Sequence, residues 1–170
     1  MTLTQLNSLP GDEFVRVVGP VFEHSPWIAE ATWAKRPFAS VEQLHQALCR
    51  TVAEAGEDKQ VELIQAHPDL VGRAALAGTL TAASNREQAS AGLGRLGAEE
   101  IAAFQKYNQA YREKFGFPFV ICARLNKKEA ILKGFEVRLK NTRPQEVKIA
   151  LEEIGRIAWL RLQDIVGGQS

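Results

Sequence analysis

Two ionisable residues stand where a protein could use them to transfer protons. His67 closes a helical pattern that begins near Asp58, and Pro68 follows it directly. Because a residue before proline is pushed out of the α-helical region, the helix should end at His67 and leave the imidazole accessible on a rigid turn. Glu87 lies further along, near the start of another helical pattern. An imidazole titrates near neutrality, so a His and a Glu held on two helix ends are predicted to form an acid–base pair.

Each of these residues also has a purely structural interpretation. A histidine near the C-terminus of a helix can interact with the helix dipole instead of a substrate. The spacing of Ser84 and Glu87 is that of a capping box, in which the serine caps the helix and the glutamate reaches back to the N–H of the cap. Spacing alone therefore leaves catalysis and helix termination open for both residues.

An isolated apolar segment raises the question of what pairs with its backbone. Residues 117–123 read Phe-Pro-Phe-Val-Ile-Cys-Ala, and the proline favours an extended conformation. No other part of the sequence is typical of a partner strand, so the buried N–H and C=O groups need other partners. We expect helix ends, water or a ligand to supply them. The alternative is a simple connector that crosses the core.

A single arginine interrupts the apolar face of the last predicted helix. The face recurs at steps of four and three residues, as a buried helical stripe does. Its members are Val147, Leu151, Ile154, Ala158, Arg161 and Ile165. A guanidinium there requires an anion, because an uncompensated buried charge is costly. Arg161 is predicted to form a structural salt bridge, to extend its head group to the surface, or to bind a substrate carboxylate with two parallel hydrogen bonds.

The elements that must position these residues are all predicted to be helices. Ser25 and Ser40 are predicted helix caps, Gly56 and Gly116 are predicted stops, and residues 3–10 are expected to form a short lead-in. Residues 69–83 lack periodicity and predict a functional loop with room for one helical turn. The fold class is all-α, a single irregular bundle of about eight helices in one domain, residues 1–170. The predicted helices cover residues 12–18, 26–34, 40–55, 58–67, 84–93, 98–115, 127–141 and 144–166.

Composition excludes several classes of protein. A net charge of +1, from 21 basic and 20 acidic residues, gives no strong field for nucleic acid or a membrane surface. Cys49 and Cys122 are far apart in sequence, which is typical of buried thiols in a reducing compartment. No secretory signal, membrane-spanning run or peroxisomal tripeptide is found, and a cytoplasmic location is expected.

Metal and phosphate sites also lack support in the sequence. The three histidines, His24, His45 and His67, do not pair with another ligand at the spacing typical of zinc sites. Glycine-rich phosphate loops and the serine motif of the α/β-hydrolases are missing as well. We therefore expect no metal.

Several strings in the sequence, taken together, resemble one enzyme family. The chain is similar, from about Leu6 to Val166, to the OHCU decarboxylases of urate breakdown, where OHCU is 2-oxo-4-hydroxy-4-carboxy-5-ureidoimidazoline. The resemblance rests on Glu23-His24-Ser25-Pro26-Trp27, Arg36-Pro37-Phe38, Ala66-His67-Pro68-Asp69-Leu70, Ser84 with Glu87-Gln88, the segment from Lys114 to Ile121, and Arg161.

The resemblance implies a fold, a reaction and a set of site residues. It implies an all-helical, dimeric, cofactor-free enzyme that converts the small molecule OHCU to (S)-allantoin, with His67 as the catalytic histidine. Substrate contacts are implied for Pro68, Ser84, Asn85, Arg86, Glu87, Gln88, Phe119, Val120, Ile121, Cys122, Ala123 and Arg161. Two other functions compete with this one. One is a non-catalytic helical module that binds a peptide or a purine-derived ligand, and the other is a ureide hydrolase in which His67 activates water.

Overall fold

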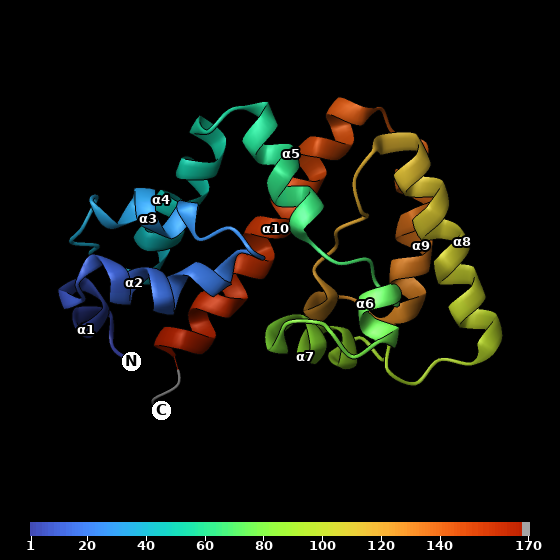
Figure 1. Ribbon diagram of the computed structural model, residues 1–170, viewed down its shortest axis with the longest axis horizontal. Coiled ribbons are helices and arrows are strands. Elements are labelled where there is room, and N and C mark those ends of the chain that lie inside the picture. Colours follow the sequence, from blue (N-terminus) through green and yellow to red (C-terminus); the bar gives the residue numbers. More distant parts are fainter. Residues whose placement is uncertain (168–170) are drawn as a thin grey trace. The chain divides into compact units, whose positions relative to one another are not determined.

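Every regular element in the part of the chain that the structure describes is a helix (Figure 1). The computed structural model describes residues 1–167, apart from the Ala74 side chain. The predicted all-α fold class is confirmed for these residues. Contacts divide the chain into two compact units: Met1–Ala66 together with the chain from Gly155 onward, and His67–Ile154.

The first unit combines the helices of the N-terminal part of the chain with the later part of the last helix. They are α1 (Leu3–Ser8), α2 (Gly11–Val18), the 3-10 helix η1 (Gly19–Val21), α3 (Trp27–Trp33), α4 (Val41–Glu54), α5 (Glu57–Ala66) and, from Gly155 onward, the later part of α10 (Arg143–Val166). Helix α3 packs against both α2 and α4, and these helices bury Phe14, Ile28, Leu44 and Leu48. Full burial of such a side chain is worth about 1.5–3 kcal/mol, which is why these faces meet.

Two local predictions in this unit are wrong. Residues 3–8 form helix α1 and are not a lead-in, because Thr2 and Gln5 make a reciprocal capping box. Ser25 does not cap α3; its hydroxyl donates to the carbonyl of Glu23 at 2.8 Å. The prediction for Ser40 is confirmed, since its hydroxyl accepts the N–H of Gln43 at the start of α4.

The second unit holds two long helices and an aromatic core. Its elements are α6 (Arg73–Leu76), α7 (Ala82–Ser90), α8 (Ala98–Phe115), the 3-10 helix η2 (Ala123–Leu125), α9 (Lys128–Arg138) and the part of α10 up to Ile154. Residues 69–83 were predicted to be a loop with room for one helical turn, and α6 is that turn. Helix α8 packs against α9, and α7 packs against η2. The rings of Phe119 and Phe135 stack with their centroids 3.9 Å apart, and Tyr111 lies edge-on to both.

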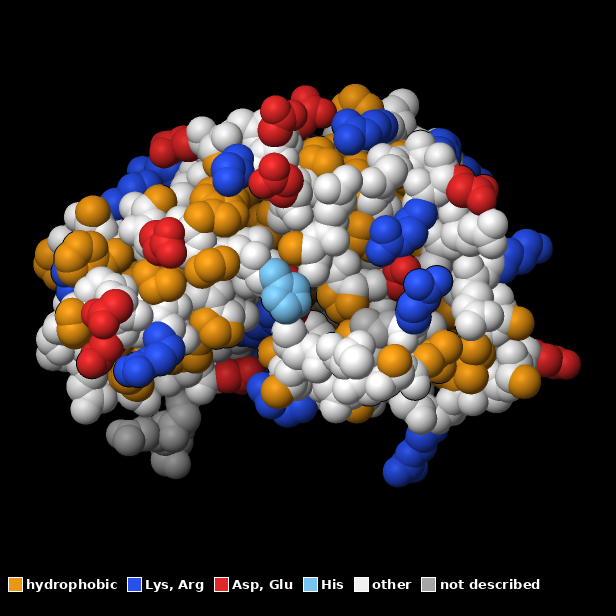
Figure 2. All heavy atoms as spheres, in the orientation of Figure 1, with side chains coloured by type: hydrophobic (Ala, Val, Ile, Leu, Met, Phe, Trp, Pro, Cys, Tyr) orange, Lys and Arg blue, Asp and Glu red, His pale blue; other side chains and the backbone are white. Residues whose placement is uncertain are grey.

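The surface carries charges of both signs. Figure 2 shows acidic and basic side chains interspersed on the face that it presents. Among residues 1–167, no helix combines the length and the apolar character that crossing a bilayer requires. The only large apolar side chains that are more than half exposed in this range are Leu76, Leu125 and Val137.

Candidate active site

Helix α5 ends at Ala66, so His67 is the first residue of the turn that follows. The predicted break before Pro68 is therefore confirmed. The expectation of an accessible imidazole is wrong, because His67 is only 6% exposed and its Nε2 atom is buried. The turn does not project into solvent: side chains from two helices of the second unit bind it.

Helix α7 binds the turn through the amide of Gln88. The Oε1 atom of Gln88 accepts the Val71 N–H at 3.2 Å, and its Nε2 atom donates to the Asp69 carbonyl at 3.4 Å. Val71 has a φ of +53°, which is rare for a β-branched residue and costs energy that the surroundings must offset. Gln88 thus supports a backbone geometry that the turn would not adopt alone.

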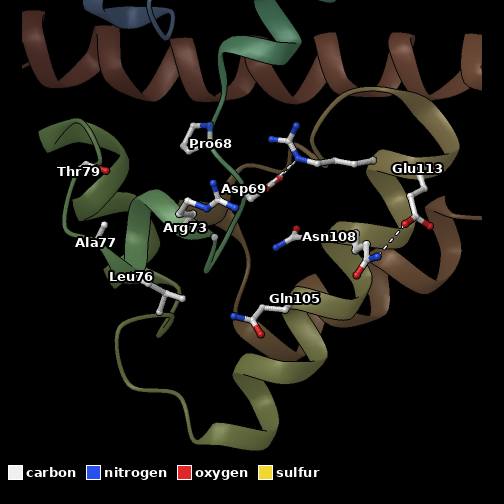
Figure 3. A pocket seen from close by; sticks show the side chains of 12 residues that line it. Pro68, Asp69, Arg73, Leu76, Ala77, Thr79, Gln105, Asn108 and Glu113 are labelled. Atoms are coloured by element: carbon white, nitrogen blue, oxygen red, sulfur yellow. Dashed lines mark hydrogen bonds and ion pairs between the residues drawn. The ribbon is translucent and has the colours of Figure 1, made fainter.

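Helix α8 binds the same turn through two further side chains. Asn108 donates from Nδ2 to the Leu70 carbonyl at 2.7 Å. The Nε atom of Arg112 lies 2.9 Å and 3.0 Å from the two carboxylate oxygens of Asp69 (Figure 3). Every residue from Asp69 to Val71 therefore has a backbone or side-chain bond to α7 or α8.

Three of the predicted site residues share the buried face of α7. Ser84, Glu87 and Gln88 are 5%, 8% and 6% exposed, because positions three and four residues apart lie on the same side of a helix. Asn85 and Arg86, also predicted to contact the substrate, lie on the exposed side.

The capping-box interpretation of Ser84 and Glu87 is wrong. Helix α7 begins at Ala82, and the Thr81 hydroxyl caps it by accepting the N–H of Ser84 at 3.2 Å. Thr81 occupies the N-cap position because the helix starts earlier than its apolar pattern suggests. Glu87 therefore lies inside the helix and has no role in starting it.

The predicted extended segment is present, and side chains satisfy its backbone. Arg138 donates from Nη1 to the Val120 carbonyl at 2.6 Å, and the Cys122 N–H donates to Oε2 of Glu153 at 3.3 Å. The Cys122 carbonyl accepts from the Asn126 amide at 2.9 Å. The expected partners were helix ends, water or a ligand, whereas three of these backbone groups are paired with the side chains of Arg138, Glu153 and Asn126. Phe119, Val120, Cys122 and Ala123 are buried, and Ile121 is partly exposed.

A buried polar network holds Arg138 beneath this segment. Its Nε atom donates to Glu146 at 2.8 Å, and its guanidinium lies over the Phe119 ring, 4.2 Å from the centroid. The Tyr111 hydroxyl also donates to Glu146, at 2.5 Å. Burial, and then the hydrogen bond to this carboxylate, raise the pKa of Tyr111 well above its ordinary value. The network keeps the Tyr111 phenol protonated and the chain at Phe119 in one place.

Helix α7 and the extended segment come together at Cys122. Burial raises the pKa of the Cys122 thiol, and the negative charges of Glu153 and Glu87 raise it further. The position of Glu153 is set by its bond to the Cys122 N–H, and Glu87 lies on α7, which packs against η2 directly after Cys122. The thiol stays protonated at neutral pH, which argues against a nucleophilic role for it.

Arg161 belongs to the first unit, where it has an acidic partner. Its Nη2 atom lies 2.8 Å from Oε1 of Glu23, and its Nη1 atom donates to the Pro20 carbonyl at 3.1 Å. The two charged side chains are 7% and 2% exposed. The structural salt bridge that the apolar stripe predicted is therefore present. Carboxylate binding by Arg161 stays a prediction.

Sequence reasoning missed several residues that shape this site. Arg138, Glu146 and Glu153 lie on buried helix faces, as Arg161 does. A charge among the apolar positions of a helical stripe is the sequence signal for such residues, and it predicted Arg161 alone. Asn108 and Arg112 left no such signal, because polar residues on α8 are expected at its surface.

No metal site was found among the described side chains: residues 1–167, Ala74 apart, hold no cluster of three or more His, Cys, Asp or Glu suited to a metal ion. A cleft of about 1240 Å³ lies beside the turn, with Pro68, Asp69, Asn108 and Arg112 in its wall (Figure 3).

Comparison with known proteins gives consistent matches over nearly the whole chain. The family model for OHCU decarboxylase matches residues 7–163, which spans both units. A 2-oxo-4-hydroxy-4-carboxy-5-ureidoimidazoline decarboxylase of Halalkalicoccus jeotgali is 42% identical, over 97% of this chain and 92% of that protein. The Amia calva protein of the same name is 44% identical, over 98% of this chain and 95% of that one.

Solved structures resemble the chain as well, among them the following two. The crystal structure of an (S)-allantoin synthase is 30% identical with a TM-score of 0.79, over 98% of this chain and 54% of that chain. An OHCU decarboxylase solved in the presence of (S)-allantoin has a TM-score of 0.70 at 20% identity, over 93% of this chain and 99% of that one, which is a likeness of fold.

Proposed function

The chain belongs to the OHCU decarboxylase family, and we propose that it converts OHCU to (S)-allantoin and CO₂ with its own side chains as the acid and base. The observation that carries this proposal is the match along nearly the full chain to proteins of that name. The geometry of the second unit supports it, since a buried histidine, a buried glutamate and an extended segment are linked there through α7.

The reaction requires the enzyme to orient the substrate and to transfer protons. The substrate carries a carboxylate and a hydroxyl on one ring carbon. When the bond to the carboxylate breaks, CO₂ leaves and the electron pair moves into the ring, toward the neighbouring carbon and its imine nitrogen. The imine nitrogen takes up one proton and the neighbouring carbon takes up another, the hydroxyl loses one to become a carbonyl, and (S)-allantoin results, with a net uptake of one proton. Because the new stereocentre forms at the protonation step, the enzyme must deliver that proton to one face.

We assign the proton transfer to His67 and a supporting role to Glu87. An imidazole exchanges protons near neutral pH, and the bound turn restricts where its ring can lie. Glu87 either orients His67 or accepts the proton of the substrate hydroxyl. Backbone groups of residues 119–123, with Pro68, Ser84 and Gln88, are proposed to contact the substrate, and Arg161 is proposed to bind its anionic group.

The remaining features of the proposal extend the family resemblance. We propose a homodimer of single-domain chains in the cytoplasm, with no cofactor and with OHCU as the small-molecule partner. Sedimentation equilibrium of the purified chain measures the oligomeric state directly. A monomer at all concentrations that support turnover would overturn the dimer.

One experiment tests the function and separates it from its competitors. Freshly generated OHCU is added to the purified chain, and the handedness of the allantoin is followed by circular dichroism while released CO₂ is measured. We expect (S)-allantoin and CO₂ in equal amounts. A ring opened without CO₂ would indicate a ureide hydrolase, and tight binding without any product would indicate a binding module.

A further inference from the structure

We propose that Arg112 and Asn108 on α8 are positioning residues for His67: they hold the Pro68–Val71 turn so that the imidazole stays in place for proton transfer. The proposal rests on the proposed function. The turn begins at the catalytic candidate, and its first three residues after Pro68 are Asp69, Leu70 and Val71. Arg112 binds the side chain of the first, and Asn108 binds the carbonyl of the second.

Two helices hold the turn, and each binds different atoms of it. Gln88 of α7 takes up the Val71 N–H and the Asp69 carbonyl. Asn108 and Arg112 stand four residues apart on α8 and so lie on the same face of that helix. In Figure 3 the Asn108 side chain projects from α8 toward the loop that carries Asp69. If the α8 contacts were lost, the turn would still have the two Gln88 bonds from α7 but would lose its restraint from α8.

The Arg112–Asp69 pair is poorly suited to a purely stabilising role. The Arg112 side chain is 46% exposed and that of Asp69 22% exposed. Ion pairs in such positions contribute little to stability, because water screens them and two long side chains lose freedom. The pair can affect the reaction rate much more than stability, because a displacement of a reacting group by about 1 Å can lower a rate by about 10²-fold. A bond from one Nε to both oxygens of Asp69 restrains position more than it stabilises the fold.

Asn108 complements this restraint from inside. It is 6% exposed, and its bond to the Leu70 carbonyl is the shortest of those that hold the turn. A buried carbonyl that lost this donor would have to find another partner or move. The left-handed backbone conformation of Val71 is strained, so we expect the turn to relax when a restraint is removed.

The test compares Arg112→Met with Lys133→Met as a matched control. Lys133 also lies in the second unit and also forms an ion pair with an acidic residue, Glu136 at 3.3 Å, on the surface of α9. Lys133 and Glu136 do not bond to the turn; Glu136 accepts instead from the Tyr107 hydroxyl. For each variant, kcat and KM for OHCU and the midpoint of urea unfolding are measured. Arg112→Lys is added as the conservative variant.

We expect Arg112→Met to lower kcat about tenfold, with KM within twofold and the same unfolding midpoint as Lys133→Met. Arg112→Lys should recover part of kcat, since it keeps a cationic donor for Asp69. Asn108→Leu should lower kcat at least as much per folded molecule. A kcat for Arg112→Met within twofold of the Lys133→Met value overturns the proposal, and so does a loss fully explained by unfolded protein.

A second readout does not depend on the reaction. Nitrogen NMR of the imidazole rings reports each histidine, and His67 is assigned by the signal that is missing in His67→Asn. We expect Arg112→Met to shift the ring signals of His67 and leave those of His24 and His45 in place. If the His67 signals shift but the wild-type chain does not decarboxylate OHCU, the proposed function fails and the positioning role stands. Unshifted His67 signals overturn the positioning role even in an active enzyme.

Discussion

Replacement of Arg161 by methionine should destabilise the protein strongly. Methionine fills a similar volume but leaves the carboxylate of Glu23, only 2% exposed, without its cation 2.8 Å away. Removal of one partner of a buried ion pair costs about 3–5 kcal/mol, because the other charge is left in a poorly solvated position. In a chain of this size, 1 kcal/mol corresponds to about 2–4 °C in Tm, so the expected loss is on the order of 6–20 °C.

The assay is a thermal melt of Arg161→Met beside the double variant Glu23→Gln, Arg161→Met. The double variant removes the stranded charge and should recover most of the lost stability, since a neutral amide is less costly to bury than a carboxylate. His24, with its Nε2 atom 3.8 Å from Glu23, can compensate only in part because it is 70% exposed. A single variant that melts within 2 °C of the wild type would refute this reasoning.

The same variant separates the two roles of Arg161. Turnover is measured at a temperature where the single variant is still folded. If Arg161 also binds the substrate's carboxylate, the folded fraction should show a steep fall in affinity or rate. Normal turnover per folded molecule would leave Arg161 with its ion pair to Glu23 and remove it from substrate binding.

Three further predictions concern the reaction. His67→Asn should fold normally and lose about 10²–10⁴ of kcat, the usual share of a general acid–base, and near-normal turnover in a folded variant would exclude that role. Glu87→Gln should keep the unfolding midpoint, because Thr81 and not Glu87 caps α7, and should lose activity; unchanged turnover would remove Glu87 from the mechanism. Dialysis against a strong chelator should leave turnover intact, and activity that disappears and returns with one added metal ion would contradict a cofactor-free reaction.

The positions of the longer helices follow from local sequence. Helix α8 begins after one glycine and ends at another, Gly116, whose φ of 81° only glycine adopts readily. The break between α5 and the turn follows from Pro68, because its ring excludes the helical conformation at His67. Such signals act within a few residues, so the all-α class and the helix order could be predicted from sequence.

Helix starts were less predictable where two polar residues compete. Thr81 and Ser84 are both suitable caps, and the sequence pattern favoured the later one because a glutamate follows it at capping-box spacing. Helix α1 is hard to predict for a related reason: it is six residues long and largely polar, and the capping box of Thr2 and Gln5 is its main local signal. The free-energy differences between alternative caps are about 1 kcal/mol, which packing of the flanking chain can outweigh.

The sequence by itself determined which residues were candidates for the chemistry, because proline, a histidine before it and a charge on an apolar stripe are visible locally. Tertiary structure alone decided that His67 is buried, that Arg138 and Glu153 hold the extended segment, and that α8 restrains the turn. The reason is physical: a buried polar group needs a partner, but the chain can supply that partner from any distance in sequence. Only the fold selects which one it is.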